Sequence, residues 1–487
     1  MNLPEDFTSY TRELMGQELF EQYLKGMEEE VPTSIRLNPF KCPLGTRVAY
    51  ENRTNATGGK TAEDKYQEVA WCHSTGRYLT ERRNFTFDPL LHAGLYYVQE
   101  ASSMFVDLVI RQYIKTPVKM LDLCAAPGGK STAVRAALPE GSLLFSNEPM
   151  RTRSQILSEN LQKFGHPDVI VTNNYPRDYK KSKLQFDVIL ADVPCSGEGM
   201  FRKDEGAIKE WSLGNVNNCW QLQREIVSDI WNSLKPGGII IYSTCTFNAH
   251  EDEENVDWIK QNLGAELLPL DIEETWNITG SLINEEPMYH FIPGKTRGEG
   301  LFMAVLRKDG STNHIDGNLG KNKKNKKEKN AKKGGKDKMN IPSNWLNQQK
   351  EWAYTQTENG IYAINTKWKA DLDEAEKSLK VIHAGIKMGF TKGKDLIPDQ
   401  SLALSIELAR ENFTSVELNY EDAICYLRKE AITLDTSVNC GYVLVTYKEF
   451  PLGWVKNLGN RANNLYPQEW KIKSSHIPEG NNTILNL

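Results

Sequence analysis

The stretch VKMLDLCAAPGGKST, residues 118–132, places an apolar run directly before a turn that contains two adjacent glycines. The apolar run predicts a buried strand, and the small residues of the turn let the backbone approach a ligand closely. Strands and helices then alternate along the chain, with further strands predicted at residues 143–145, 169–172, 186–191, 239–244 and 301–306. This alternation is typical of a parallel sheet with helices on both faces. We therefore expect an α/β, Rossmann-like domain over residues 113–308.

Three kinds of ligand compete for a glycine turn of this kind. A phosphate-binding Walker loop needs a glycine at Cys124, and a dinucleotide fold needs GxGxxG where only Gly128 and Gly129 stand. S-adenosylmethionine needs such a turn and an acidic side chain at the end of the next strand. Glu148 stands 19 residues after Gly129, at the end of the run that begins at residue 143. These features favour S-adenosylmethionine, although an ordinary turn followed by a surface glutamate also explains them.

Length, charge and cysteine usage limit the class of protein. With 487 residues the chain is too long for one compact core, so two or three domains are expected. The net charge of -5 means that any nucleic acid must meet a local basic surface. No membrane-spanning apolar stretch or signal-peptide pattern is present, which predicts a cytoplasmic protein without membrane contact. The eight cysteines form no CxxC pair and no zinc-type cluster, so we expect reduced thiols and no metal.

Residues 1–112 are predicted to form an N-terminal RNA-binding extension. The apolar spacing of residues 17–27 predicts an amphipathic helix. The alternation in residues 34–41 predicts a strand that carries Arg36 and Asn38 on its polar face. These two side chains either touch RNA or belong to a solvated edge strand, and the pattern leaves both readings open.

Composition separates the rest of the chain into a loop, a linker and a last domain. The polar run 51–64 predicts a loop. Residues 309–340 predict a flexible linker, because apolar residues nearly vanish there and positions 321–338 hold ten lysines. The linker either binds RNA or only tethers two domains. Residues 341–487 return to a globular composition and predict a C-terminal region that includes a small β-rich module.

Two cysteines stand at the ends of predicted strands. Cys195 follows Asp192 by three residues, and Cys245 follows the strand 239–244. A single such thiol would be ordinary packing. Two of them beside an S-adenosylmethionine-type turn fit methylation of carbon 5 of cytosine, because a thiolate that adds to carbon 6 makes carbon 5 nucleophilic. A carboxyl group that bonds the ring nitrogen and the exocyclic amine offsets the developing charge, and Asp192 is placed for that role.

Seven short segments carry a resemblance to a known family: RLNPFK, YVQEASSMF, LDLCAAPGGKST, NEPM, DVPCSGEGMFRKDE, LKPGG and YSTCTFNAHEDEEN. Over roughly residues 1–308 the chain resembles the RNA 5-methylcytosine methyltransferases of the Nol/Nop/Sun group. GEGMFRKD is similar to the branch that acts on bacterial small-subunit (16S) rRNA. The resemblance implies a class I S-adenosylmethionine-dependent methyltransferase fold and 16S rRNA or the small ribosomal subunit as partner. GYVLVTY and PLGWVK in the C-terminal region resemble a PUA-type RNA-binding module.

The resemblance also implies roles for particular residues. Cys245 would be the nucleophile, Cys195 would help release the product, and Asp192 would recognise and activate the base. Asn174 is the candidate for the adenine contact, where the family often has an acidic residue. The cofactor-binding residues implied are Cys124, Ala125, Ala126, Pro127, Gly128, Gly129, Lys130, Glu148, Asn174 and Asp192. Arg202 and Lys203 are expected to hold RNA phosphates near the target, unless they belong to a solvated loop.

Other functions remain open on the sequence. The same chemistry on tRNA or another RNA would use the same residues. DNA cytosine methyltransferases use a Pro-Cys nucleophile, which here is Cys195, but the second thiol at Cys245 argues against that class. A non-catalytic RNA-binding protein on a methyltransferase fold would not need Glu148, Asp192 and both cysteines intact.

Overall fold

The computed structural model of the chain describes residues 3–42, 47–48, 67–310, 342–393, 395–474 and 476–487. The predicted loop 51–64 lies outside these residues, as does nearly all of the predicted linker 309–340. Among the described residues, no helix is both long enough and apolar enough to span a bilayer.

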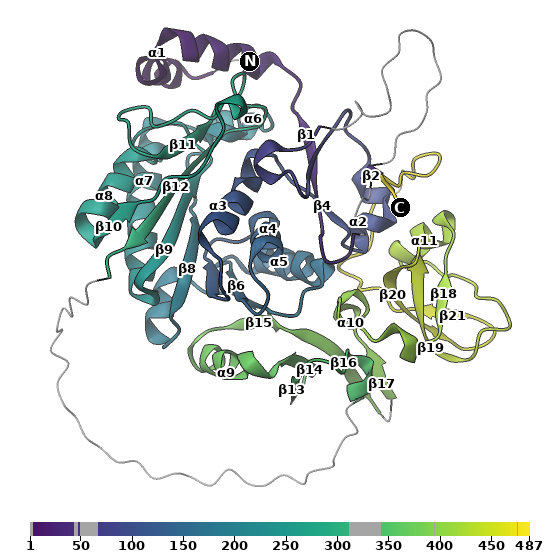
Figure 1. Cartoon of the computed structure of the whole chain (residues 1–487). Helices are drawn as coiled ribbons and strands as arrows, with labels where there is room; N and C mark the ends of the chain where they lie inside the picture. Colours follow the sequence, from purple (N-terminus) through teal and green to yellow (C-terminus); the bar gives the residue numbers. More distant parts are fainter. Residues whose placement is uncertain (1–2, 43–46, 49–66, 311–341, 394, 475) are drawn as a thin grey trace, which may run out of the picture.

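The central sheet has the strand order β10-β12-β9-β8-β5-β6-β7-β15, with β11 beside β12 (Figure 1). Strands β5 to β9 pair in parallel, whereas β12 runs antiparallel to β9. The chain leaves β5 in one direction and returns to its other side at β8, and such a switch point is where open α/β sheets bind ligands. Its strands are β5 (Lys119–Asp122), β6 (Leu143–Asn147), β7 (Val169–Thr172), β8 (Phe186–Asp192), β9 (Leu234–Thr244), β10 (Ala265–Leu267), β11 (Met288–Phe291), β12 (Leu301–Lys308) and β15 (Val381–Ala384).

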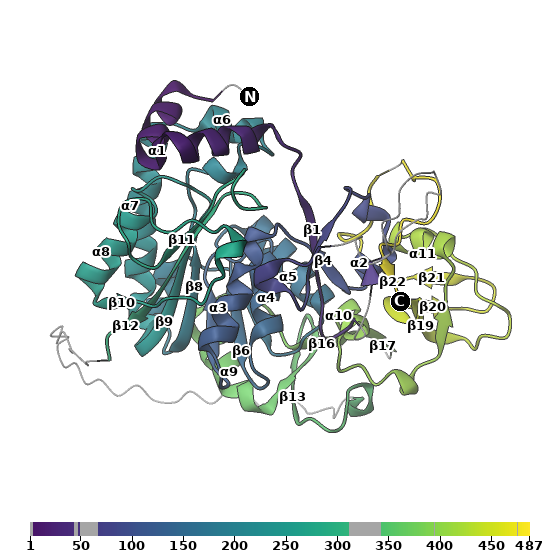
Figure 2. The same ribbon diagram turned by 45° about the horizontal axis from the view of Figure 1, so that its top comes forward.

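Helices bury both faces of this sheet, so the predicted Rossmann-like α/β fold is confirmed (Figures 1 and 2). Successive strand residues point to opposite faces, and Met120 and Leu121 accordingly belong to different apolar clusters. One face packs against α3 (Phe105–Tyr113), α4 (Gly129–Ala137) and α5 (Arg151–Phe164). The other packs against α7 (Leu213–Ile230), α8 (Glu253–Leu263) and α9 (Lys369–Ser378), the last of which comes from the C-terminal region.

The N-terminal region combines a long helix with a small sheet. α1 (Glu5–Glu28) begins well before the predicted residue 17, and Gly16 interrupts it with φ 73° and ψ 165°. The sheet has the order β3-β1-β4 and consists of β1 (Thr33–Leu37), β3 (Gly76–Leu79) and β4 (Tyr96–Val98). β2 (Arg47–Val48) pairs separately with β22 (Leu485–Asn486) near the end of the chain. The short helix α2 (Pro89–His92) lies between β3 and β4 in the sequence. The short helix α6 (Glu205–Glu210) lies between β8 and β9.

The C-terminal region contains two four-stranded sheets, which confirms the prediction of a small β-rich module. The first consists of β13 (Trp352–Thr357), β14 (Gly360–Asn365), β16 (Ile386–Lys392) and β17 (Asp395–Pro398). The second consists of β18 (Ser415–Glu417), β19 (Gly441–Tyr447), β20 (Phe450–Asn457) and β21 (Ala462–Asn464), with α10 (Gln400–Leu404) and α11 (Tyr420–Leu427) nearby. This second sheet shares an apolar cluster with β1 and β4 of the N-terminal sheet.

One C-terminal strand joins the central sheet itself. β15 pairs antiparallel with β7, and Val381 lies opposite Thr172. The backbone N–H of Asn173 donates to Lys380 O at 2.9 Å, which continues the pairing beyond the end of β7. The C-terminal region therefore closes the edge of the sheet that is nearest to Glu148 and Asn174.

Candidate active site

The turn between β5 and α4 has the backbone that its glycines predict. Gly128 has φ 114°, a left-handed conformation that residues with a side chain rarely adopt, and α4 begins at Gly129. The backbone N–H of Ala125 donates to Asn147 O at 2.8 Å and ties the turn to β6. A side chain at Gly129 would begin 3.3 Å from the Tyr97 ring. The turn is therefore fixed in place, with its backbone against β4.

A cavity of about 210 Å³ opens beside this turn. Ser131 Oγ donates to Asp122 Oδ2 at 2.6 Å, whereas Asp122 Oδ1 has no hydrogen-bond partner among the described residues. Burial raises the pKa of Asp122 to about 7. An unpaired carboxylate oxygen suits a ligand that carries an ammonium group. The cavity is lined by Tyr97, Val98, Gln99, Glu100, Ser103, Asp122, Cys124, Ala125, Ala126, Pro127, Gly129, Lys130 and Asp192.

Sequence reasoning missed six residues of this cavity, Asp122 and five from the segment 97–103. Asp122 is the last residue of β5, and a carboxylate at the carboxyl end of a parallel strand was the signal that could have found it. Tyr97 comes from β4 of the N-terminal sheet, and its position beside Gly129 depends on how two sheets pack. The sequence carries no comparable signal for that contact.

Glu148 lies one residue beyond β6 and is buried, with 1% of its surface exposed. Its Oε1 accepts from the backbone N–H of Met150 at 2.9 Å, and Arg153 Nη1 stands 3.5 Å from Oε2. Arg153 also donates to Ala126 O at 3.0 Å, so it spans the distance between Glu148 and the glycine turn. Glu148 and the turn thus lie at the same edge of the sheet, as the β-α-β spacing predicts.

Asn174 is engaged by the C-terminal region. Its Oδ1 accepts from Lys380 N at 3.0 Å, and its Nδ2 donates to Lys380 O at 3.3 Å. These bonds use one lone pair of Oδ1 and one N–H of Nδ2, and the adenine contact predicted for Asn174 stays a prediction. The neighbouring Met150 and Tyr175 are each 53% exposed and are the apolar side chains that flank this edge.

The thiols of Cys195 and Cys245 face each other, with their sulfur atoms 2.7 Å apart. Cys245 also donates its backbone N–H to Cys195 Sγ at 3.3 Å. The neighbouring Cys245 thiol and burial together raise the pKa of Cys195 well above its usual value. The raised pKa favours the protonated form of Cys195 while the two thiols are in contact, and in that form its S–H can donate to Cys245 Sγ. The structure brings together two residues that are 50 positions apart in the sequence.

Asp192 connects the glycine turn to the strand that carries Cys245. Its Oδ2 lies 2.9 Å from Lys130 Nζ, and its Oδ1 accepts from Ser243 Oγ at 2.7 Å. Burial acts to lower the pKa of Lys130, but the Asp192 carboxylate outweighs burial and raises it. Asp192 remains partly exposed, with 28% of its side chain accessible, and it lines the cavity. A ligand that enters the cavity therefore meets a carboxylate whose orientation is fixed from two sides.

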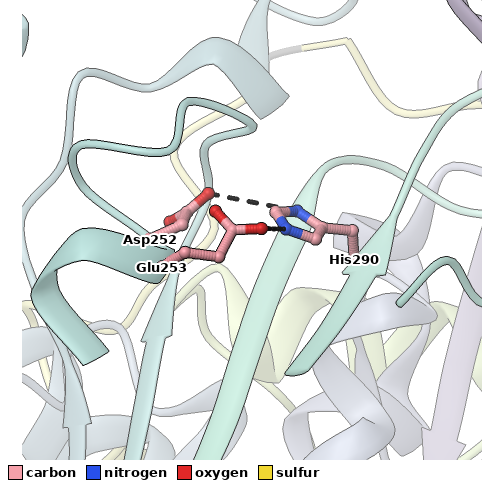
Figure 3. A group of neighbouring side chains, drawn as sticks. All are labelled: Asp252, Glu253 and His290. Atoms are coloured by element: carbon pink, nitrogen blue, oxygen red, sulfur yellow. Dashed lines mark hydrogen bonds and ion pairs between the residues drawn. The ribbon is translucent and has the colours of Figure 1, made fainter. Parts of the chain in front are cut away.

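Three buried side chains, Asp252, Glu253 and His290, lie next to one another close to the loop of Cys245. Glu253 Oε1 lies 2.9 Å from Nε2 of His290, and Asp252 Oδ2 lies 4.0 Å from Nδ1 of the same ring (Figure 3). One possible ligand atom from each of the three residues lies within 4.8 Å of the other two, but Glu253 already hydrogen-bonds the histidine directly. Burial acts to raise the pKa of Glu253, but His290 outweighs burial and lowers it. We therefore describe Asp252, Glu253 and His290 as a buried ion-pair group.

Three family profiles match consecutive parts of the chain. The profile "16S rRNA methyltransferase RsmB/F" matches residues 114–307. "N-terminal domain of 16S rRNA methyltransferase RsmF" matches residues 3–101, and "Methyltransferase RsmF PUA domain" matches residues 413–472. The chain belongs to the RsmB/F family of 16S rRNA methyltransferases. Within it, the N-terminal and PUA profiles point to the RsmF type.

Individual members of the RsmB/F family are similar over nearly the whole chain. Ribosomal RNA small subunit methyltransferase F of Escherichia coli O81 (strain ED1a) is 28% identical over 481 residues, which is 96% of both chains. The protein of the same name from Shigella boydii serotype 4 (strain Sb227) has the same identity and coverage.

Solved structures share the fold. A methyltransferase homolog from Pyrococcus horikoshii has a TM-score of 0.51 at 24% identity, over 63% of this chain and 95% of that one. NSun6 from Pyrococcus horikoshii, solved with SFG, has a TM-score of 0.50 at 18% identity, over 63% and 98%.

The structure corrects three of the four RNA-contact predictions for this RsmB/F chain. Arg36 is 1% exposed, and its guanidinium donates to Gln99 Oε1 and Thr132 Oγ1. Asn38 is equally buried, and its Nδ2 donates to Gly94 O and Phe164 O. The polar face of β1 therefore packs against the catalytic domain, where it cannot reach RNA.

Arg202 is the third correction, and Lys203 differs from it. The Arg202 side chain is 5% exposed and pairs with Glu299 at 2.5 Å. It also donates to Gly26 O at 2.6 Å, which ties α1 to the catalytic domain. Its charge is thus used inside the protein. Lys203 is exposed, so its predicted phosphate contact stays a prediction.

Proposed function

We propose that the chain uses S-adenosylmethionine to form 5-methylcytosine in 16S rRNA, in the cytoplasm, through a covalent bond between Cys245 and the target base. The observation that carries this proposal is the contact between the Cys195 and Cys245 thiols, with Asp192 on the adjacent strand. Two facing thiols beside a carboxylate supply a nucleophile, a second acid-base group and a base-binding group in one place.

The residues of the cavity suit S-adenosylmethionine. The backbone of the turn from Cys124 to Lys130 would hold the methionine part, and Asp122 Oδ1 is available for its ammonium group. Glu148, at the end of the next strand, would accept from the ribose hydroxyls. The archaeal NSun6 structure, which shares this fold, was solved with SFG, an analogue of S-adenosylmethionine. When bound, S-adenosylmethionine supplies an electrophilic methyl group.

The reaction begins with the cytosine outside its stack, because neither face of a stacked ring is open to a thiolate. Cys245 Sγ adds to carbon 6, which makes carbon 5 nucleophilic. In this step the Asp192 carboxyl carries a proton, which it donates to the ring nitrogen, and its other oxygen accepts from the exocyclic amine, so the negative charge that develops on the ring nitrogen is neutralised. Lys130 and Ser243 hold the Asp192 carboxyl group during this step.

Product release needs a second group. Once Cys245 Sγ is bonded to carbon 6, the main cause of the raised pKa of Cys195 is gone, so Cys195 can release its own proton to solvent. After carbon 5 has received the methyl group, the Cys195 thiolate accepts the carbon 5 proton, and the bond between Cys245 Sγ and carbon 6 then breaks. Cys245 then departs as a thiolate and the ring regains its double bond. Cys195 is the titratable side chain in contact with Cys245, so we assign it to this later step.

Single cysteine variants separate the two roles. Purified Cys245→Ala should show no methyl transfer and no covalent RNA adduct on a denaturing gel. Cys195→Ala should transfer the methyl group but trap an adduct with substrate RNA and S-adenosylmethionine, and that adduct should vanish in the double variant. Cys440→Ala is the matched control, because Cys440 is exposed on the C-terminal region and should behave as wild type.

An adduct that persists in Cys245→Ala would reverse the assignment and favour the DNA-type mechanism with Cys195 as nucleophile. Bisulfite sequencing of rRNA from cells without the gene would identify the cytosine. If every 16S cytosine kept its methylation state while a tRNA lost one, the rRNA substrate would be wrong even though the chemistry stood.

A further inference from the structure

Glu251 contacts the loop of Cys195 at the residue that follows the cysteine. It is fully buried, and its carboxylate accepts from the backbone N–H of Ser196 at 3.1 Å. Gln223 Nε2 donates to Glu251 Oε2 at 2.7 Å and to Pro194 O at 2.9 Å. Asn248 Nδ2 donates to the other carboxylate oxygen at 3.0 Å. The residues on both sides of Cys195 are thus held by one Gln–Glu pair.

The next residue, Asp252, does the same for Cys245. Its Oδ1 accepts from Thr244 Oγ1 at 2.5 Å and from Thr246 Oγ1 at 3.0 Å. All three side chains are buried. The two threonines flank Cys245, so a single carboxylate oxygen fixes the backbone on both sides of that thiol.

These two carboxylates share a rigid base. They precede α8 directly, and Glu253 at its first turn is paired with His290 of β11 (Figure 3). Tyr242 of β9 donates to Glu251 O at 2.7 Å. Glu251 and Asp252 are consecutive, so a shift of one moves the other. The segment that carries them therefore links the loop of Cys195 to the loop of Cys245.

Resting on the function proposed above, we infer that Glu251 and Asp252 are positioning residues that act on different steps: Asp252 on attack by Cys245, and Glu251 on product release through Cys195. Neither carboxylate lines the cavity beside the glycine turn, so their effect on the reaction passes through the cysteine loops. A loss of thiol alignment of this kind slows a step by on the order of tenfold to a hundredfold.

Separate variants test the role of Glu251 in product release and the role of Asp252 in attack by Cys245. Glu251→Gln places an amide N–H₂ among three donors, so it should loosen the Cys195 loop and make the adduct accumulate during turnover, as Cys195→Ala does. Asp252→Ala should slow adduct formation by roughly tenfold or more when measured in a Cys195→Ala background. Thr244→Val with Thr246→Val should reproduce that slowing with the carboxylate intact, and it replaces Asp252→Ala if that variant does not fold.

Two controls show whether the effect is specific. Asp252→Asn keeps an oxygen acceptor for both threonines, and burial raises the pKa of Asp252, which favours a neutral group at this position. It should therefore form the adduct at nearly the wild-type rate. Glu254→Gln changes an acid in the same segment that pairs with His250 at the surface, and it should leave both steps unchanged.

The outcomes distinguish this inference from the proposed function. If Cys195→Ala with the native segment forms no adduct, the proposed function fails. If that adduct forms but the Glu251 and Asp252 variants slow formation and release equally, in step with their loss of thermal stability, the two residues are only structural and the inference is wrong.

Discussion

Asp122 gives a pH dependence that can be measured on the folded protein. Its pKa is raised from 3.8 to about 7 by burial, so the folded chain binds this proton more tightly than the unfolded chain. The resulting stabilisation is complete below pH 3.8 and is lost as pH rises through 7. Between pH 6 and pH 8 the loss from this one group is about 1.4 kcal/mol.

Asp122→Asn should remove this pH dependence, because the amide oxygen can still accept from Ser131 and no charge forms. The melting temperature of Asp122→Asn relative to wild type should therefore be higher at pH 8 than at pH 6. The difference between the two proteins cancels the titration of their common groups. An equal difference at both pH values would mean that Asp122 titrates normally.

At the scale of single residues, the sequence predicted which side chains lie together where they follow predicted strands, whereas their roles stay predictions. Cys195, Cys245 and Asp192 follow apolar runs, and parallel strands bring their carboxyl ends to one edge. Arg36 shows the limit. The period of two in residues 34–41 correctly separates the two faces of β1, but alternation cannot tell whether the polar face meets water or another domain. Here it meets Gln99 and Thr132.

At the scale of elements, β15 should influence the cofactor site. Lys380→Pro removes the N–H that Asn174 Oδ1 accepts, together with the Nζ contact to Asn173 Oδ1. Asn173 donates to the backbone O of Glu148, so its loosening should reach the residue proposed to bind the cofactor ribose. We expect S-adenosylmethionine affinity to fall by about two- to tenfold in a calorimetric titration, the worth of one hydrogen bond.

The backbone effect has a matched control. Lys380→Met removes only the Nζ contact and should keep nearly full affinity. Hydrogen exchange at Val169–Thr172 should be faster in Lys380→Pro than in Lys380→Met. Equal exchange in the two variants would show that β15 does not support β7.

Helices and strands could be predicted when the apolar pattern of their own residues identified them. Most strands of the methyltransferase core contain runs of three or more apolar residues, with turn signals around them. β15 is four residues long, and its partner β7 belongs to another predicted domain, so no local pattern identifies the pairing. For α1, the apolar spacing of residues 17–27 found the second half, whereas Gly16 hid the first half from a pattern that assumes one continuous helix.

At the scale of the whole molecule, RNA must bind through local cations, because the net charge is -5. Lys203→Glu should weaken RNA binding and reduce the slope of log affinity against log salt by about one. Arg202→Met should behave differently, because it leaves Glu299 buried without its partner. That change should cost about 3–5 kcal/mol of stability and lower the melting temperature. An unchanged salt slope in Lys203→Glu would remove Lys203 from the RNA-binding surface.

The pairing of Thr172 with Val381 also sets an order of events during synthesis. When β7 leaves the ribosome its outer edge has no partner, and β15 follows only after the intervening chain has been translated. At the usual rate of elongation that interval lasts on the order of 10–40 s. During this interval the nascent chain has an open strand edge, the part of a sheet most prone to pair with other chains. By the end of the interval the chain also includes the glycine turn, Glu148 and both cysteines. The finished sheet thus depends on the last third of the polypeptide, and an interrupted translation product would be expected to aggregate before it could act as an enzyme.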